Sequence, residues 1–351
     1  MRQLILSGLI AASIVPASAC AQDVEIDTNM ALEHMRVLAA DDMNGRLTGT
    51  EDAAMAREYI AGEYFMAGLL AFEETWDQPF TYRRPQNADL ELSGINLVGY
   101  HPAADGSASG PAIVVTAHYD HIGNCNGQIC NGADDNASGV AAMLAAASAL
   151  ANGANEHMII FAALDAEENG LNGARELVEY LQGLGIEMAL NINLDMLAFN
   201  EDNELAAAGA FHHPFLRAHI DAVEVPDGVT IIQGYDSPEW GPNGDWTFSS
   251  DHAAFHRAGI PWIYYGVDFH PHYHSHTDEF DVMHHDFFEA VTETVFNAIV
   301  YFDANLQSVV EAHAEADAAP SPSAGPDTSS DARPAGYTNE DGRYIKPGME
   351  N

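Results

Sequence analysis

Basic side chains are scarce in this sequence. Of its 351 residues, 12 are Lys or Arg and 53 are Asp or Glu, which gives a formal net charge of −41, and Lys346 is the single lysine. Proteins that bind nucleic acids or anionic membranes attract the phosphate groups with Lys and Arg side chains. Nucleic acids and anionic membrane surfaces are therefore excluded as partners.

Cysteine is also rare, with three residues in the whole chain, Cys20, Cys125 and Cys130. In an oxidising compartment, Cys125 and Cys130 are close enough in sequence to form a small disulfide, which we expect. The alternative is a pair of metal ligands. It fits structural zinc poorly, because the sequence has no second pair of cysteines to complete such a site.

The first residues of the chain hold an apolar run, residues 4–15, that is too short to span a membrane. Arg2 precedes the run and small residues follow it, which predicts a secretory signal peptide over residues 1–21. We therefore expect a secreted or periplasmic protein. A lipid anchor on Cys20 is the alternative, although Ala17 stands where lipoprotein signals usually carry Leu.

No segment of roughly 20–50 residues repeats along the chain, which excludes solenoids and propellers. We expect one large domain over residues 22–309. The remaining residues, 310–351, are acidic and rich in Ala, Pro and Ser, and this composition predicts a disordered tail.

Apolar strand and helix patterns alternate along the domain, which predicts an α/β fold: a mixed, largely parallel twisted sheet with helices on both faces. The first two strands, separated by a Gly-, Ser- and Pro-rich loop, are expected to form a hairpin. The predicted strands are residues 96–100, 112–117, 157–164, 189–194 and 261–267. The predicted helices are residues 28–40, 51–70, 139–150, 173–181, 214–223 and 287–306.

Side chains that bind metals follow the predicted strands. In open parallel sheets, ligands bind beyond the carboxyl ends of the strands. Imidazole nitrogens and carboxylate oxygens suit Zn²⁺, with Co²⁺ or Mn²⁺ as substitutes. The candidates are His118 with Asp120, the pair Glu167 and Glu168, Asp195, a histidine within residues 270–276, and Asp134 in a Gly- and Asn-rich loop.

Five ligands are enough for two metal ions if one carboxylate is shared, because co-catalytic ions lie roughly 3.5–4 Å apart. Asp134 is the residue we expect to bridge. Glu167 and Glu168 are adjacent, so one can bind a metal while the other faces a water molecule. A metal-activated water beside a carboxylate base predicts hydrolysis.

Three competing motifs are missing or incomplete. Asp134 to Gly139 resembles the start of an EF-hand, but the twelfth position is Ala145 instead of Glu. The chain also has no G-x-S-x-G elbow and no H-E-x-x-H helix. Calcium binding, serine hydrolysis and helix-borne zinc proteolysis therefore lose their usual signals.

The histidine-rich segment 270–276 is ambiguous. His270, His272, His274 and His276 alternate, so an extended backbone would place all four on one side. Spacing does not choose among them. The alternative is a surface tract that binds metal adventitiously.

Taken together, these segments resemble the co-catalytic dinuclear zinc exopeptidases, the family that includes bacterial leucyl aminopeptidase, aminopeptidase Y and glutamate carboxypeptidase. The resemblance covers about residues 30–306. It rests on these motifs: GRLTGT (45–50), AHYDHIG (117–123), GADDNASG (132–139), EENGLNGA (167–174), NLDM (193–196), SDHAAF with GIP (250–261) and YHSHTDEFD (273–281).

The resemblance implies a role for each matching residue. His118 and Asp195 would hold one zinc, Glu168 and His274 the other, and Asp134 would bridge them. Glu167 would act as the general base. Asp120 would orient His118, and Asp135 would follow a cis peptide beside the bridging ligand.

The resemblance also implies the fold of that family and two zinc ions. Only about forty residues separate Phe72 from Ala112, where the strand that leads to the first histidine motif begins, so we expect no inserted protease-associated domain. The predicted activity is that of an aminopeptidase acting on peptides, because a substrate carboxylate would need a nearby basic residue and such residues, Arg257 among them, are few near the motifs. The alternatives are a carboxypeptidase, a glutaminyl cyclase with one zinc, and a noncatalytic binding module.

Overall fold

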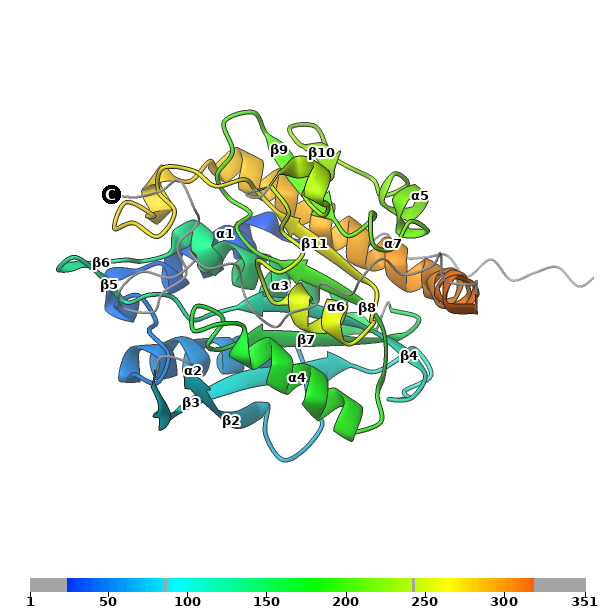
Figure 1. Cartoon of the computed structure of the whole chain (residues 1–351), viewed down its shortest axis with the longest axis horizontal. Helices are drawn as coiled ribbons and strands as arrows, with labels where there is room; N and C mark the ends of the chain where they lie inside the picture. Colours follow the sequence, from blue (N-terminus) through cyan, green and yellow to red (C-terminus); the bar gives the residue numbers. More distant parts are fainter. Residues whose placement is uncertain (1–23, 85–86, 154, 242–243, 319–351) are drawn as a thin grey trace, which may run out of the picture.

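A mixed β-sheet crosses the middle of the molecule, with helices on both of its faces (Figure 1). The computed structural model describes residues 24–84, 87–153, 155–241 and 244–318. Within these residues the sheet has nine strands in the order β1-β3-β7-β4-β8-β11-β9-β10, and β2 pairs with β3. The strands are β1 (Leu70–Ala71), β2 (Asp77–Arg84), β3 (Asn87–His101), β4 (Pro111–His118), β7 (Met158–Leu164), β8 (Glu187–Leu194), β9 (Glu204–Ala208), β10 (Thr230–Gln233) and β11 (Trp262–Gly266).

The four central strands β7, β4, β8 and β11 run parallel to one another. Toward the edges, β3 is antiparallel to β7, and β9 is antiparallel to β11. The predicted fold class, a mixed and largely parallel sheet between helices, is confirmed. The consequence for function is that the carboxyl ends of the four central strands open at the same edge of the sheet.

Two apolar layers hold the helices against the sheet, and β4 shows how the sequence builds them. Ile113, Val115 and Ala117 face one layer, which α1, α2, α3 and α7 complete. Ala112 and Val114 face the other layer, with α4 and α6. Successive side chains on a strand point to opposite faces, so an uninterrupted apolar run marks a strand that is covered on both sides.

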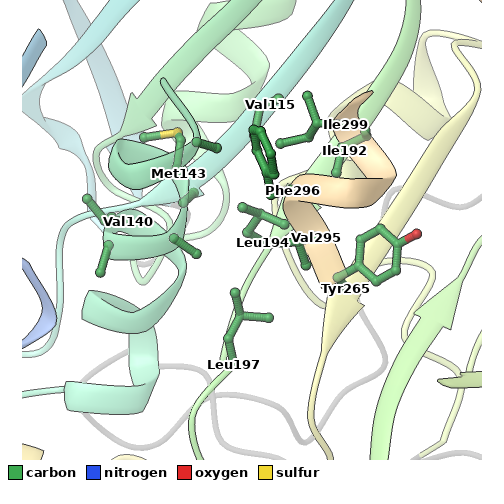
Figure 2. Packing of buried hydrophobic residues seen from close by; sticks show 14 of the residues in the cluster. Val115, Val140, Met143, Ile192, Leu194, Leu197, Tyr265, Val295, Phe296 and Ile299 are labelled. Atoms are coloured by element: carbon green, nitrogen blue, oxygen red, sulfur yellow. The ribbon is translucent and has the colours of Figure 1, made fainter. Parts of the chain in front are cut away.

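The larger layer contains the side chains of Figure 2, where Val140 and Met143 of α3 and Val295 and Phe296 of α7 lie near Leu194 and neighbouring residues of the sheet. The helices are α1 (Thr28–Leu38), α2 (Glu51–Met66), α3 (Gly139–Ala149), α4 (Asn172–Gly183), α5 (Leu216–Ile220), α6 (His252–Arg257) and α7 (His285–Ala318).

The expected hairpin between the first two predicted strands is wrong. Strand β7 lies between β3 and β4, antiparallel to the first and parallel to the second. All seven residues of β7 are buried. Because β7 is apolar on both faces, it takes a central place in the sheet with a paired strand on each side. The connection from β3 to β4 therefore passes from one side of β7 to the other.

The last helix is longer than predicted. Instead of ending at residue 306, α7 continues to Ala318. Val309 is fully buried and Val310 packs against the core, so the apolar stripe extends past the predicted boundary. The expectation of disorder is therefore wrong for residues 310–318. The predicted signal peptide, Cys20 and residues 319–351 lie outside the described residues.

Candidate metal centre

The carboxyl ends of three parallel strands bring the candidate ligands together. His118 is the last residue of β4 and pairs in register with Leu164, the last residue of β7. Glu167 and Glu168 follow β7 after a short turn, and Asp195 follows β8 directly. Strand ends at one edge of a parallel sheet place these side chains within reach of one another, as the sequence predicts.

A first cluster forms around His118, whose side chain is almost completely buried. Its Nε2 atom lies 3.3 Å from Asp195 Oδ1 and 3.4 Å from Asp135 Oδ1. One imidazole and two carboxylates converge here, with one ligand atom of each within 4.8 Å of the others. This is a ligand set that suits a divalent zinc ion.

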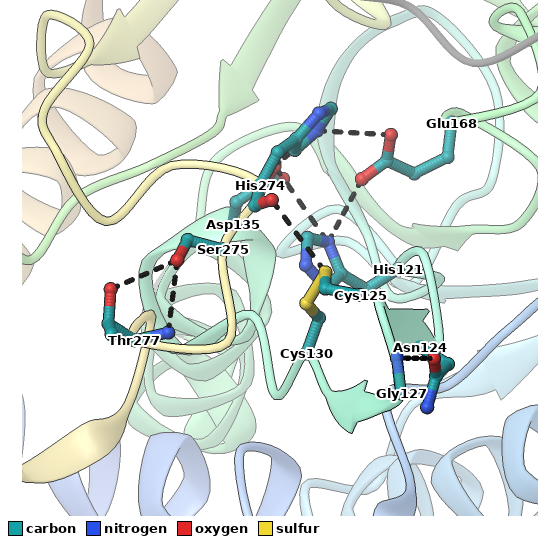
Figure 3. The surroundings of a disulfide bond; sticks show 10 residues. All are labelled: His121, Asn124, Cys125, Gly127, Cys130, Asp135, Glu168, His274, Ser275 and Thr277. Atoms are coloured by element: carbon teal, nitrogen blue, oxygen red, sulfur yellow. Dashed lines mark hydrogen bonds and ion pairs between the residues drawn. A yellow bond between two sulfur atoms is a disulfide. The ribbon is translucent and has the colours of Figure 1, made fainter. Parts of the chain in front are cut away.

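A second cluster forms on the other side of Asp135. His274 Nε2 lies 3.0 Å from Asp135 Oδ2 and 3.2 Å from Glu168 Oε2. His121 reaches the same cluster, with its Nδ1 atom 2.9 Å from Glu168 Oε1. Figure 3 shows the side chains of His121, His274 and Glu168 converging with Asp135. Asp135 therefore presents one oxygen to each cluster.

The structure brings His118, Glu168, Asp195 and His274 together, but it does not bring Asp134 to the shared position. Asp134 Oδ2 lies 2.8 Å from His270 Nε2, and its Oδ1 accepts a hydrogen bond from the amide of Ala198. The choice of Asp134 as the residue between the clusters is thus corrected to Asp135. The two residues are adjacent, and their carboxylates point in different directions.

The backbone around Asp135 explains the difference. Its φ and ψ angles, −104° and 93°, and those of Asn136, −132° and 46°, are not helical, and the peptide bond between the two residues is cis. The predicted cis bond therefore follows Asp135 instead of preceding it. Asp278 fixes this segment, because its carboxylate accepts hydrogen bonds from the amides of Asp134 and Asp135. Burial raises the pKa of Asp278 to about 7.

Asp120 contributes differently from what the resemblance implies. His118 Nδ1 lies 3.0 Å from the backbone carbonyl oxygen of Asp120, and 3.7 Å from its carboxylate. The carboxylate instead accepts hydrogen bonds from the amides of Glu167 and Glu168, at 3.0 and 3.3 Å. Its main contact is therefore with the turn that carries the two glutamates.

Glu167 lies beside the first cluster and lines a pocket with it. Burial raises the pKa of Glu167 well above its usual range, and the neighbouring Glu168 carboxylate acts in the same direction. A carboxyl group with a raised pKa is a stronger base, and its protonated form can return the proton.

The pocket above the clusters has aromatic walls. Among the residues that the structure describes, its lining contains no Arg and no Lys. Residues of the two clusters and Glu167 line it together with Met196, Trp246, Phe248, Ser249, Tyr264, Phe269 and Tyr273.

The histidine-rich segment is not extended as the alternation would require. It folds into turns, so that His270 contacts Asp134 while His274 contacts Asp135 and Glu168. His272 lies 2.9 Å from the hydroxyl of Thr277, away from both clusters. One of the four histidines therefore reaches the clusters directly, and it is the one that the resemblance implies.

The predicted disulfide is present between Cys125 and Cys130, on the hairpin of β5 (Asn124–Cys125) and β6 (Gln128–Ile129). The sulfur of Cys125 lies 3.7 Å from the carbonyl oxygen of His274 (Figure 3). The hairpin therefore packs against the backbone that carries one of the cluster histidines.

Sequence reasoning missed two members of the centre, Asp135 as the shared carboxylate and His121. The signal for His121 was its place three residues after His118, in a segment where the strand ends and the chain turns.

The set of donors fits two divalent zinc ions. Within the part of the chain that the structure describes, His121 Nδ1 and Glu168 Oε1 are buried atoms that form no hydrogen bond, although buried polar atoms rarely lack partners.

A family model with the description Peptidase family M28 matches residues 96–299. The alkaline phosphatase isozyme conversion protein of Escherichia coli (strain K12) is 30% identical over 165 residues, which cover 44% of this chain and 47% of that protein. Aminopeptidase YwaD of Bacillus subtilis (strain 168) is 32% identical over 154 residues, which cover 42% of this chain and 30% of that protein. The matched stretch is thus less than half the length of either relative.

Solved structures with the same fold include BSAP, a zinc aminopeptidase from Bacillus subtilis, at a TM-score of 0.63 and 16% identity, covering 81% of this chain and 96% of that one. Bacteroides thetaiotaomicron glutaminyl cyclase bound to N-acetylhistamine superposes at a TM-score of 0.62 and 19% identity, covering 79% of this chain and 98% of that one. Two different activities therefore occur on this fold.

Proposed function

Because the chain belongs to peptidase family M28, we propose that it is a zinc aminopeptidase that removes N-terminal residues from peptides. The observation that carries the proposal is the placement of Asp135. Its two carboxylate oxygens face two clusters of imidazole and carboxylate groups, with Glu167 beside them at the floor of a pocket.

In this proposal, His118, Asp135 and Asp195 hold one zinc ion, and Asp135, Glu168 and His274 hold the other, with Co²⁺ or Mn²⁺ as substitutes. Zinc ions held there polarise a carbonyl group, stabilise developing negative charge on its oxygen and lower the pKa of water.

Glu167 supplies the proton transfers. It takes a proton from the attacking water and gives that proton to the amine that leaves. Its raised pKa supports this role, since the same group must act first as a base and then as an acid. Asp120 holds the backbone of Glu167 in place through its carboxylate.

The pocket lining favours the amino end of a peptide over the carboxyl end. Acidic side chains and no Arg or Lys line it, so a positively charged α-amine is attracted and a substrate carboxylate is repelled. Arg257, which follows the SDHAAF motif, lies outside this lining, 4.9 Å from the ring centre of Phe248. Aromatic walls suit an apolar first side chain.

Glutaminyl cyclase is the second candidate, because this fold also carries that activity in the Bacteroides structure. A cyclase needs one zinc, whereas both clusters here have their donors. The number of metal ions therefore distinguishes the two candidates.

We further propose a secreted or periplasmic location, from the predicted signal peptide, with a lipid anchor at Cys20 as the alternative. Among the residues that the structure describes, no helix is long and apolar enough to cross a membrane.

The test uses the zinc-loaded protein with four substrates: leucinamide, N-acetyl-leucinamide, a peptide blocked at its amino end with a free carboxylate, and a peptide that begins with Gln. We expect hydrolysis of leucinamide alone among the amides, and about two zinc ions per chain. Hydrolysis of the blocked peptide would indicate a carboxypeptidase. Loss of ammonia from the Gln peptide with one zinc would indicate a cyclase, and no turnover of any substrate would contradict an enzyme.

A further inference from the structure

His121 is an unusual residue in the metal centre. Its side chain is completely buried, and neither imidazole nitrogen forms a hydrogen bond within the described part of the chain. One nitrogen of a neutral imidazole carries a lone pair, which can bind a metal ion. Buried imidazole nitrogens that form no hydrogen bond are costly unless something else satisfies them.

Two carboxylates lie close to one nitrogen of the His121 ring. His121 Nδ1 lies 2.9 Å from Glu168 Oε1 and 3.8 Å from Asp135 Oδ2, and one ligand atom of each residue lies within 4.8 Å of the others. Glu168 Oε1 also forms no hydrogen bond, despite the short contact. The ring nitrogen therefore does not point at the oxygen.

Two ligands of a single zinc ion have this relationship. With zinc about 2.0–2.1 Å from each donor, the donors lie roughly 3 Å apart and both point at the ion instead of at each other. A hydrogen bond at this distance would have the opposite geometry, with the N–H directed at the oxygen.

The backbone holds the ring in this position from two sides. The amide of His121 donates to the carbonyl oxygen of Arg46, and Leu47 pairs with His121 as a short parallel bridge. Gly132, at a φ of 56°, lies against the ring, and a Cβ atom there would be 2.6 Å from His121 Cδ2. The ring has little freedom to turn away, which a fixed ligand requires.

From these contacts, the geometry points to His121 Nδ1 as an additional ligand of the second zinc ion, beside Asp135, Glu168 and His274. This inference rests on the proposed zinc centre and extends it. The two metal positions then differ. The second is closed by four protein ligands, as in structural zinc sites, while the first keeps three and an open position for substrate.

The direct test is X-ray absorption at the zinc edge of the full-length, zinc-loaded protein, which counts imidazole ligands. We expect three imidazoles for two zinc ions, from His118, His121 and His274. Two imidazoles for two zinc ions would overturn the inference, whether or not leucinamide is hydrolysed. Leucinamide turnover tests the proposed function separately, since a protein without turnover can still show three imidazoles.

Substitution of His121 gives a second test of whether it binds the second zinc ion. His121→Ala should lower the affinity for the second zinc by at least about 10-fold in competition with a chelator, because loss of even an outer partner of a ligand costs that much. The cobalt-substituted variant should show a changed visible absorption band. His272→Ala is the matched control, since His272 belongs to the same histidine-rich segment as His274 but contacts Thr277, away from both clusters. Equal zinc affinity in the His121 variant and in the control would overturn the inference.

Discussion

Asp120 Oδ1 accepts a hydrogen bond from the backbone amide of Glu167 at 3.0 Å, so a residue just beyond β4 positions the proposed general base that follows β7. The same carboxylate accepts from Glu168, at 3.3 Å, and from the hydroxyl of Thr48, at 3.0 Å. Its role is to fix the turn that carries a proposed base and a proposed zinc ligand.

Removing the Asp120 carboxylate should therefore impair turnover more than substrate binding. We expect Asp120→Ala to lower kcat by about 100-fold, the usual effect of a misplaced catalytic group, with a smaller change in KM. Asp120→Asn keeps one acceptor oxygen, so its kcat should lie between that of the original protein and that of Asp120→Ala. Steady-state kinetics on leucinamide, with zinc content measured in parallel, checks this. A kcat within 3-fold of the original protein in Asp120→Ala would contradict it.

The two adjacent aspartates provide a matched pair for the metal centre. Asp135→Asn should reduce bound zinc below two per chain, because the shared position loses its charge and one metal-binding oxygen. Asp134→Asn should retain two, since its carboxylate contacts His270 and the amide of Ala198. Elemental analysis after dialysis distinguishes the variants. The reverse order of zinc loss would restore Asp134 as the bridging residue.

The sequence predicts the central strands of the sheet and most of the centre, because each of these strands ends at a recognisable apolar-to-polar boundary. His118, Glu168 and Asp195 stand at such boundaries, so the parallel strands bring them together without further information. The choice between Asp134 and Asp135 depends on one irregular turn, and spacing does not encode its backbone angles.

His121 was missed for a related reason. Alternation along a strand predicts where His118 and Asp120 point, but the strand ends at His118 and the chain then turns. The position of β7 between β3 and β4 depends on pairing between strands that are distant in the sequence, whereas the composition of the loop between β3 and β4 suggested a hairpin. Local sequence patterns thus predict where strands and helices lie, whereas the order of the strands in the sheet depends on burial over the whole sheet.

Arg46 should be important for stability, because its buried guanidinium donates to four backbone carbonyls. The acceptors are Leu38, Tyr119, Asn131 and Gly132. An unpaired buried polar group costs about 1–3 kcal/mol, so Arg46→Met should lower the free energy of unfolding by at least about 3 kcal/mol. Arg46→Lys should recover less than half, since an ammonium has three donors and no planar fork. Urea unfolding measures both. A loss below about 1 kcal/mol in Arg46→Met would contradict this role.

His34 should make the fold sensitive to acid. Burial lowers its pKa from 6.5 to about 4. The unfolded chain therefore binds a proton at higher pH than the fold does, so stability falls as the pH drops from about 6.5 to about 4, and the effect is absent above pH 7.5.

In His34→Gln this contribution disappears. When the pH falls from 7.5 to 5, the free energy of unfolding should decrease in both proteins. The decrease should be smaller in the variant by up to about 2 kcal/mol, at about 1.4 kcal/mol per pKa unit. Urea unfolding at the two pH values gives the comparison. The exposed His276, changed to Gln, is the control and should leave the pH dependence as it was. Identical pH dependence in all three proteins would rule out His34 as a source.

The most direct measurement of the central claim compares the zinc-loaded protein with Glu167→Gln, a substitution that keeps the shape of the side chain and removes its ability to accept a proton. The account predicts two zinc ions per chain in both proteins and a loss of leucinamide turnover of at least about 100-fold in the variant, the usual contribution of a general base. Equal turnover with both zinc ions bound would contradict Glu167 as the base and, with it, the proposed mechanism.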